Sequence, residues 1–542
     1  MHMSLPSRSE SVDSTIAYDF ENEIKEMRAI YERVFPTQNL HYLIYMGESA
    51  IWSHPEIIEG AYTPNSRDLS PHFLGTVKRP GLREDSPEIT VKISIPRQAL
   101  PSEQKQTDAP WQPHNRLRPL FAVNTLAYEY IRFQAEMRRL HKSKHHLMRS
   151  LPLGDGTELL PKPQRPVTDK RPAALIGMYW LETGGAEKLG FDTIRWALET
   201  GLRVFVVACV PSIQRLAHKL PDHPDVTFIR VDRWLPGYLW AHFVEKLVLE
   251  ENITLVHNHH CIPLYEMLPL LRSRLPWVKT LDSTHIVEYV DGGYPRISGV
   301  WSNYLDMQHV ISGELVTYLQ EAFNAPVSKV VLGRMLNRVE DAAPMPELRL
   351  KARQKGLHVA FIGRMYYQKR PVVAVEILRA LDAWANKNGV DFSATMVGEG
   401  PFEGTVTRLL RRYGLGAKVT QMPGNTDVPA LLERSDILIL PSNNEGLALV
   451  CYEAIAHGCI PISTRVGSQD ELLPDDLLVP LPPHKTVRQT VFAVDRMWHD
   501  KEFLQRQKDG LAKRWLKLSA DPTAEEVLKP IYQAAFEDAK EN

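Results

Sequence analysis

The chain has 542 residues, of which 44% are hydrophobic and 24% charged, and its formal net charge is −1. This is the composition of an ordinary globular protein, long enough for about three or four domains. The near-zero charge argues against a general nucleic-acid binder, which needs a basic surplus. No apolar run reaches the roughly 18 residues that a membrane-spanning helix requires.

The cysteines indicate a reducing compartment. All four (Cys209, Cys261, Cys451 and Cys459) lie in or beside apolar segments, and no two form a C-x-x-C pair. Such residues are typical of a reduced core. Because the N-terminus also lacks the apolar core of a signal peptide, we expect a cytoplasmic protein.

Residues 1–170 predict an α+β extension. An amphipathic helix is expected at 22–35, and strands at 41–47, 72–79 and 88–96. A basic helix follows near 126–149, and clustered prolines between 161 and 172 indicate a linker. The basic helix can be a solvated face, an oligomer contact, a dock for an acidic ligand or a contact with an anionic membrane.

From residue 171 onward, short apolar strands alternate with helices. Seven strands are expected in 171–345, and the pattern restarts with five more in 346–542, where helices continue beyond Lys485. Alternation of this kind predicts parallel sheets covered on both faces, so we expect two doubly wound α/β domains in tandem. Ligands bind at the carboxyl ends of such strands, which places a ligand in the cleft between the domains.

Two acids stand at one of these strand ends. "PSNNEGLALVCYEAIAHG" (441–458) carries Glu445 before an expected helix and Glu453 inside it. Gly446 would let a ligand approach the main chain, and the amides of Leu447, Ala448 and Leu449 would form the positive helix start that suits phosphate. Glu445 and Glu453 would then contact sugar and ribose hydroxyls. Alternatively, Glu445 caps the helix and Glu453 pairs with a cation.

Cations and glycines stand at three further strand ends. "FIGRMYYQKRP" (361–371) supplies Gly363, Arg364 and Lys369, and two such cations can neutralise a diphosphate. "MVGEGP" contributes Gly398, and Gly184-Gly185 open the first helix of the upstream domain. A strand-terminal Arg can equally be half of a structural ion pair, and the glycine pair is no G-x-G-x-x-G fingerprint.

Together these motifs resemble the retaining glycosyltransferases of family four, which have the GT-B fold. The resemblance rests on segments 361–371 and 441–458, together with "MVGEGP" and "VGSQDELL". Looser matches occur at "TGGAE", "LVHNHH", "DSTH" and "ISGELVTYL". It covers about 171–540 and leaves 1–170 unmatched. It implies two Rossmann-like domains facing a cleft, 171–345 on the acceptor side and 346–542 on the side of the nucleotide-sugar donor.

The resemblance also implies residue roles. Arg364 and Lys369 would hold the donor diphosphate, Glu445 the transferred sugar and Glu453 the ribose. Gly185 would approach the phosphates with its main chain. His285 in "DSTH" would lie near the reacting face of the sugar. The family's usual Gly after the Lys is replaced by Arg370.

The histidines of "HNHHC" (257–261) raise the question of a metal. His257 and His259 share one strand face, but no third ligand with suitable spacing accompanies them. We expect both to line the cleft, and we expect neither a metal nor another cofactor.

The resemblance therefore implies a retaining hexosyltransferase that uses a nucleotide sugar, with UDP as the favoured nucleotide. The acceptor would be a glycan, a lipid-linked molecule or a protein in cell-surface glycan or glycoconjugate synthesis, and 1–170 would mediate oligomer or peripheral membrane contact. Deleting 1–165 is expected to leave donor hydrolysis intact but to impair transfer to the native acceptor or assembly. The alternatives are an inactive GT-B-like partner in a glycosylation complex, or an epimerase or phosphorylase of the same fold.

Overall fold

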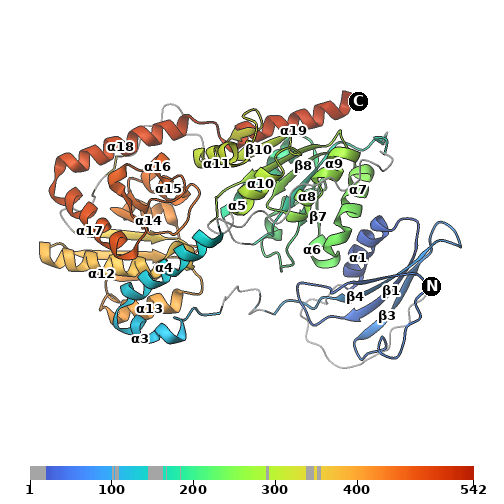
Figure 1. The fold of residues 1–542 in the computed structure, drawn as a ribbon, viewed down its shortest axis with the longest axis horizontal. Coiled ribbons are helices and arrows are strands. Elements are labelled where there is room, and N and C mark those ends of the chain that lie inside the picture. Colours follow the sequence, from blue (N-terminus) through green and yellow to red (C-terminus); the bar gives the residue numbers. More distant parts are fainter. Residues whose placement is uncertain are drawn as a thin grey trace.

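The computed structural model of the protein describes residues 20–100, 103, 109–143, 163–166, 168–182, 185–288, 292–336, 347–348, 350 and 356–541. Of 140–143, 185–186 and 539–541 it describes the main chain alone. The described residues form an N-terminal α+β unit, a pair of helices and two α/β domains (Figure 1).

The N-terminal unit is a four-stranded sheet covered by one helix. Its elements are α1 (Phe20–Val34), β1 (Asn39–Met46), β2 (Glu56–Glu59), β3 (Phe73–Arg79) and β4 (Glu88–Ile95), with the strand order β2-β4-β1-β3. The expected helix and three strands are confirmed, and β2 is additional. The apolar face of α1 joins the core of the first α/β domain, where the Tyr31 hydroxyl donates to the carbonyl of Trp234 at 2.8 Å.

The first α/β domain has a parallel sheet of seven strands in the order β11-β10-β9-β8-β5-β6-β7. The strands are β5 (Ala173–Met178), β6 (Arg203–Ala208), β7 (Val226–Ile229), β8 (Ile253–His259), β9 (Lys279–Thr284), β10 (Met307–Val310) and β11 (Val330–Leu332). The helices are α5 (Gly185–Glu199), α6 (Val231–Trp234), α7 (Trp240–Glu251), α8 (Ile262–Glu266), α9 (Leu268–Arg274), α10 (Gly293–Val300) and α11 (Gly313–Phe323).

The second α/β domain has a parallel sheet of six strands in the order β14-β13-β12-β15-β16-β17. The strands are β12 (Leu357–Ile362), β13 (Phe392–Val397), β14 (Val419–Met422), β15 (Ile437–Leu440), β16 (Ile460–Thr464) and β17 (Leu478–Val479). The helices are α12 (Pro371–Asn388), α13 (Glu403–Arg412), α14 (Val428–Arg434), α15 (Leu449–Ala456), α16 (Gln469–Leu472), α17 (Pro483–His499) and α18 (Lys501–Ala520). Two Rossmann-like α/β domains are thus confirmed.

The last helix, α19 (Ala524–Glu541), returns to the first domain (Figure 1). Its residues Leu528, Tyr532 and Ala535 are buried in the core that β5, β8 and α5 form. The sequence-based division, which gave every C-terminal helix to 346–542, therefore differs from the structure here. An amphipathic pattern shows that a helix buries one face, but not against which sheet.

The extension 1–170 is likewise shared between the two domains. While 20–97 lies against the first domain, α4 (Thr125–Ser143) packs on α12 and α17 of the second. The preceding α3 (Arg118–Val123) accepts a hydrogen bond from Arg412 of α13 at the carbonyl of Phe121, at 3.3 Å. Trp111, just before α3, stacks on Phe402 with ring centroids 4.4 Å apart. The extension is therefore divided between the two domains, whereas the sequence suggested one α+β unit. Residues 144–162, which include part of the expected linker, lie outside the described residues.

Arg334 joins the two domains where the chain crosses between them. It is 4% exposed and follows β11. Its guanidinium lies 2.6 Å from Glu471 of α16 and 2.6 Å from Asp521, which precedes α19. Glu471 also accepts the main-chain N–H of Gly313 at 2.8 Å. These bonds fix the orientation of the second domain against the first.

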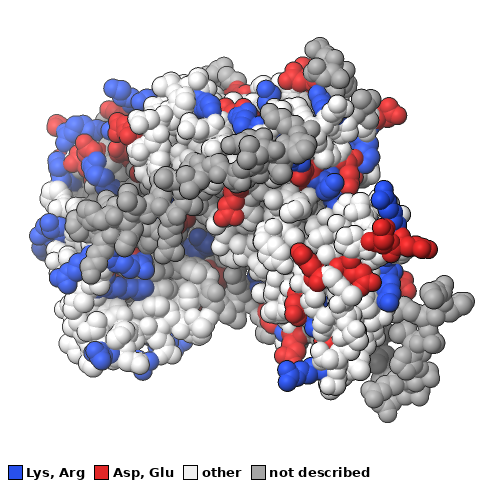
Figure 2. Space-filling model, turned by 45° about the vertical axis from the view of Figure 1, so that its right-hand side comes forward, with Lys and Arg blue, Asp and Glu red and all other residues white. Residues whose placement is uncertain are grey.

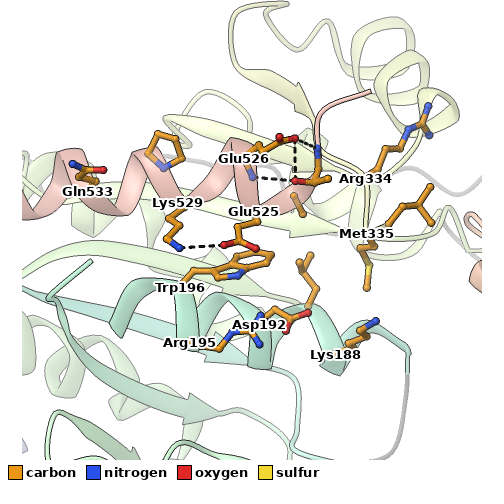
Figure 3. Close-up of a pocket in the computed structure, with 15 residues that line it drawn as sticks. Lys188, Asp192, Arg195, Trp196, Arg334, Met335, Glu525, Glu526, Lys529 and Gln533 are labelled. Atoms are coloured by element: carbon orange, nitrogen blue, oxygen red, sulfur yellow. Dashed lines mark hydrogen bonds and ion pairs between the residues drawn. The ribbon is translucent and has the colours of Figure 1, made fainter. Parts of the chain in front are cut away.

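A pocket of about 790 Å³ lies next to Arg334, between α5 and α19 (Figure 3). Arg334 and Met335 lie at one end, while Lys188, Asp192 and Trp196 of α5 face α19. The expected phosphate-binding residues, Arg364 and Lys369, are not among its lining residues. The pocket is thus separate from the cleft that the sequence predicts.

Charges of both signs occur on each half of the face shown in Figure 2, as the net charge leads one to expect. Among the described helices, none is both long and apolar enough to span a bilayer.

Replacing Arg334 by Ala should destabilise the protein by about 3 kcal/mol. This is the lower end of the range for breaking a buried ion pair, because Glu471 and Asp521 stay partly exposed. The measurement is chemical unfolding of the full chain. Arg465→Ala is the matched control, since it breaks an exposed pair with Asp475 and should leave stability unchanged. Equal effects of the two substitutions would contradict the role of Arg334.

Candidate active site

Two loops of the second domain form one surface. One follows β12 and the other follows β15, and these strands are neighbours at the position where the strand order reverses. The ammonium of Lys369 lies 2.5 Å from Oε1 of Glu445. The main-chain N–H of Asn443 donates to the carbonyl of Gln368 at 2.7 Å. The predicted residues Lys369 and Glu445 are therefore brought together.

The two acids of "PSNNEG…" have different environments. Glu445 is 6% exposed and paired with Lys369, and the helix N-cap is Ala448, so Glu445 is not the cap. Glu453 is exposed on α15, and within the described part of the chain its side chain has no hydrogen bond or ion pair. The carboxylate of Glu453 is therefore accessible to a ligand, whereas that of Glu445 is buried against Lys369.

The glycines serve the protein's own main chain. A Cβ at Gly398, whose φ is +133°, would lie 2.1 Å from the carbonyl oxygen of Gly363, and one at Gly446 would lie 2.0 Å from that of His285. These positions require Gly because two main-chain segments meet there. At Gly446 the close neighbour is therefore the main chain of the first domain, and the approach of a ligand to this glycine stays a prediction.

The helix start also differs from the expectation. Because α15 begins at Leu449, Leu447 and Ala448 precede the helix, and of the three expected amides only that of Leu449 belongs to its first turn. In the first domain, α5 begins at Gly185, whereas Gly184 lies outside the described residues.

Arg364 is exposed at the end of β12, with its guanidinium 5.3 Å from the ring centre of Tyr366. Its charge also acts on a residue of the first domain. Burial raises the pKa of Glu187, in the first turn of α5, and the charge of Arg364 opposes that rise. Arg364 therefore supplies a positive charge between the two domains.

The first domain contributes a cluster of neutral rings. The imidazole of His285 is buried, and neither nitrogen has a hydrogen-bond partner among the described residues. It meets His260 edge-on at 5.1 Å, and His260 stacks on Tyr294 at 4.1 Å. Burial lowers the pKa of His285 well below its usual value and that of His260 to about 3. His285 can thus offer hydrogen bonds but not charge.

His260 is a site residue that the sequence analysis missed. It adopts a φ of +64° at the end of β8, a conformation that is strained for a residue with a side chain. The signal was present, since His260 is the residue after His259 in "HNHHC" and the first beyond the strand.

His257 does not line the cleft, contrary to expectation. It is completely buried, with Nδ1 2.6 Å from the hydroxyl of Tyr532 and Nε2 2.8 Å from that of Ser283. His259 is 4% exposed, and its Nε2 lies 2.9 Å from the hydroxyl of Thr193. Through these hydrogen bonds, His257 connects β8 to α19 and β9, and His259 connects it to α5. The described residues contain no group of three or more His, Cys, Asp or Glu side chains arranged for a metal ion.

Comparison with known proteins agrees with this geometry. Residues 349–513 match the family model described as "Glycosyl transferases group 1". The Schizosaccharomyces pombe "Phosphatidylinositol N-acetylglucosaminyltransferase gpi3 subunit" is 26% identical over 317 residues, which cover 55% of this chain and 67% of that protein. A human phosphatidylinositol N-acetylglucosaminyltransferase subunit is 22% identical over 44% of this chain and 49% of its own length.

A third relative is the "D-inositol 3-phosphate glycosyltransferase" of Pseudarthrobacter chlorophenolicus, 31% identical over 43% of this chain and 54% of its own length. The chain thus spans between about half and two thirds of these relatives. Among solved structures, a glycosyltransferase from Rickettsia africae ESF-5 superposes with a TM-score of 0.51 at 16% identity, over 69% of this chain and 100% of that one. The fold is GT-B, as the sequence predicted.

Asp282, in the strand that leads to His285, should make stability depend on pH. It is fully buried, it accepts a hydrogen bond from Tyr265 at 2.6 Å, and burial raises its pKa from 3.8 to about 7. The folded state therefore retains a proton that the unfolded state loses, and stability falls as pH rises between these two values. Above the folded pKa the loss is complete.

Asp282→Asn should remove this component. The measurement is the unfolding free energy of both proteins from pH 5 to pH 8. The variant should gain on the wild type as pH rises and then level off above about 7. Two parallel curves would contradict a protonated Asp282.

Proposed function

We propose that this protein transfers a hexose from a nucleoside-diphosphate sugar to an acceptor hydroxyl. The observation that supports this most directly is the Lys369–Glu445 pair at the junction of β12 and β15, between exposed Arg364 and exposed Glu453. Cations suited to a diphosphate and acids suited to hydroxyls thus occupy one strand edge. The match of 349–513 to the family model supports the same function.

In this proposal, Arg364 and Lys369 stabilise the negative charge that develops on the departing diphosphate. Preorganised cations of this kind act mainly in the transition state. Glu445 contacts the transferred sugar and Glu453 the ribose. His285, neutral and without a protein partner for its ring among the described residues, hydrogen-bonds the sugar from the first-domain side.

The proposed reaction retains the configuration at the anomeric carbon. The bond from that carbon to the diphosphate oxygen breaks, and a bond to the acceptor oxygen forms on the same face. The acceptor proton passes to the leaving phosphate oxygen. No protein nucleophile takes part, so the buried Glu445 needs only to hydrogen-bond the sugar.

For the donor we propose UDP-N-acetylglucosamine, and for the acceptor a hydroxyl of an inositol-type polyol. The support is that the S. pombe and human relatives carry N-acetylglucosaminyltransferase in their names together with phosphatidylinositol, and the bacterial relative carries inositol 3-phosphate. An inactive binding partner is the alternative. The presence of all four charged residues favours an enzyme.

The function is tested by mixing the full chain with UDP-N-acetylglucosamine, UDP-glucose and GDP-mannose in separate reactions, with and without phosphatidylinositol vesicles or inositol 3-phosphate. Release of UDP from the first donor, together with a glucosaminylated product, is the expected result. Binding of a nucleotide sugar without turnover of any donor would favour the inactive partner instead.

The two acids should have separable kinetic effects. Glu453→Ala should chiefly raise the KM for the donor, because ribose contacts are the same in the ground and transition states. Glu445→Ala should chiefly lower kcat, because sugar contacts matter most as charge develops. The control is Glu502→Ala, an exposed acid in the first turn of α18. Unchanged kinetics in both variants would remove the acids from the site.

Turnover should not require a divalent metal, because Arg364 and Lys369 already supply positive charge. EDTA should leave the wild-type rate nearly unchanged. Arg364→Ala should lower kcat by about 10²- to 10³-fold, as loss of a transition-state charge donor does, and Arg364→Lys should recover part of it. Loss of activity in EDTA that Mn²⁺ restores would contradict this assignment.

A further inference from the structure

Helix α4 of the N-terminal extension lies behind the loop that carries Lys369. The guanidinium of Arg132 is 3.5 Å from the ring centre of Tyr367, two residues before Lys369. It also lies 5.0 Å from the ring centre of Trp111 and 5.4 Å from that of Phe402. Arg132 is thus held among three aromatic rings, the setting in which a cation–π contact is strongest.

Arg370, which follows Lys369 in this loop, is the residue that departs from the family pattern. Arg370 has φ +51° and ψ +54°, a left-handed conformation that suits the family's usual Gly, and it is 2% exposed. Here an arginine side chain is buried at that position. On α4, the buried carboxylate of Glu129 lies 3.8 Å from the guanidinium of Arg132, one turn further along the helix. Burial raises the pKa of Glu129, and the charges of Arg132 and Arg370 oppose the rise.

Tyr367, in contact with α4, and its neighbour Gln368 connect to the second site loop by hydrogen bonds. Its carbonyl accepts from the side-chain amide of Asn443 at 3.2 Å, and the amide of Gln368 donates to the carbonyl of Asn444 at 2.9 Å. Lys369 then reaches Glu445. A displacement of the Tyr367 ring would therefore move both site loops together.

We propose that α4 is a positioning element of the donor site: Glu129 pairs with Arg132, Arg132 holds Tyr367, and together they set the position of Lys369. The proposal rests on the proposed function for the role of Lys369. It gives the extension a part in donor binding. Neither residue of α4 touches the substrate.

This proposal reverses the expectation that deleting 1–165 leaves donor hydrolysis intact. The deletion would remove Trp111, Glu129 and Arg132 and expose the aromatic surface of Phe402 and Tyr367. We now expect it to weaken nucleotide binding.

The test measures UDP binding to the full-length protein by calorimetry, at a temperature well below unfolding. Arg132→Ala should raise the dissociation constant by about 3- to 30-fold, the range set by a desolvated cation–π contact. Arg132→Lys, which keeps the charge but not the flat guanidinium, should fall between. The control is Arg139→Ala on the same helix, whose side chain is 64% exposed and which should bind UDP like the wild type.

A second readout does not depend on ligand. Hydrogen exchange in the unliganded protein should accelerate at 366–370 and 443–445 in Arg132→Ala but not in β5. A purely structural role would lower the unfolding temperature without changing UDP affinity or local exchange.

The outcomes separate the two proposals. Failure of the wild type to bind UDP, with exchange accelerated as expected, would count against the nucleotide assignment and leave α4 as the element that orders the loop. Equal UDP affinity and equal exchange in wild type and Arg132→Ala would overturn the positioning role. It would leave the proposed function standing.

Discussion

The ion pairs of Arg334 are the constraint on which the site depends. The chain crosses between the domains after β11 and again before α19. Arg334, at the first crossing, forms an ion pair with Asp521 at the second. It also forms an ion pair with Glu471 of the second domain, across the interface. Burying a charge is costly unless it is fully paired, so the arrangement is intolerant of rotation. With the domains fixed in this way, Gly446 can meet the carbonyl of His285.

That contact divides the chemistry between the two sides. The second domain supplies charge, through Arg364 and the Lys369–Glu445 pair. The first supplies neutral rings, because burial lowers the pKa values of His260 and His285. A negatively charged leaving group would thus be drawn to one side, while the sugar would meet hydrogen-bonding groups of the other. The N-terminal helix α4 supports the charged side from behind.

The sequence predicted what local patterns determine. Short apolar runs identified twelve of the thirteen strands in the α/β domains, where the two-residue β17 was missed. The four-residue β2 of the N-terminal unit was missed as well. What it could not show depends on distant partners. The pattern of α19 does not reveal that Tyr532 bonds His257, nor that of α4 that Arg132 stacks on Tyr367. The local pattern also does not reveal that Gly446 meets the carbonyl of His285 in the other domain.

The most direct test of the proposed site is a crystal structure of the full chain with UDP-N-acetylglucosamine bound. We expect the diphosphate within hydrogen-bonding distance of Arg364 and Lys369, the ribose at Glu453 and the sugar between Glu445 and His285. A nucleotide bound elsewhere, for example in the pocket between α5 and α19, with Lys369 and Glu445 still paired to each other alone, would contradict it.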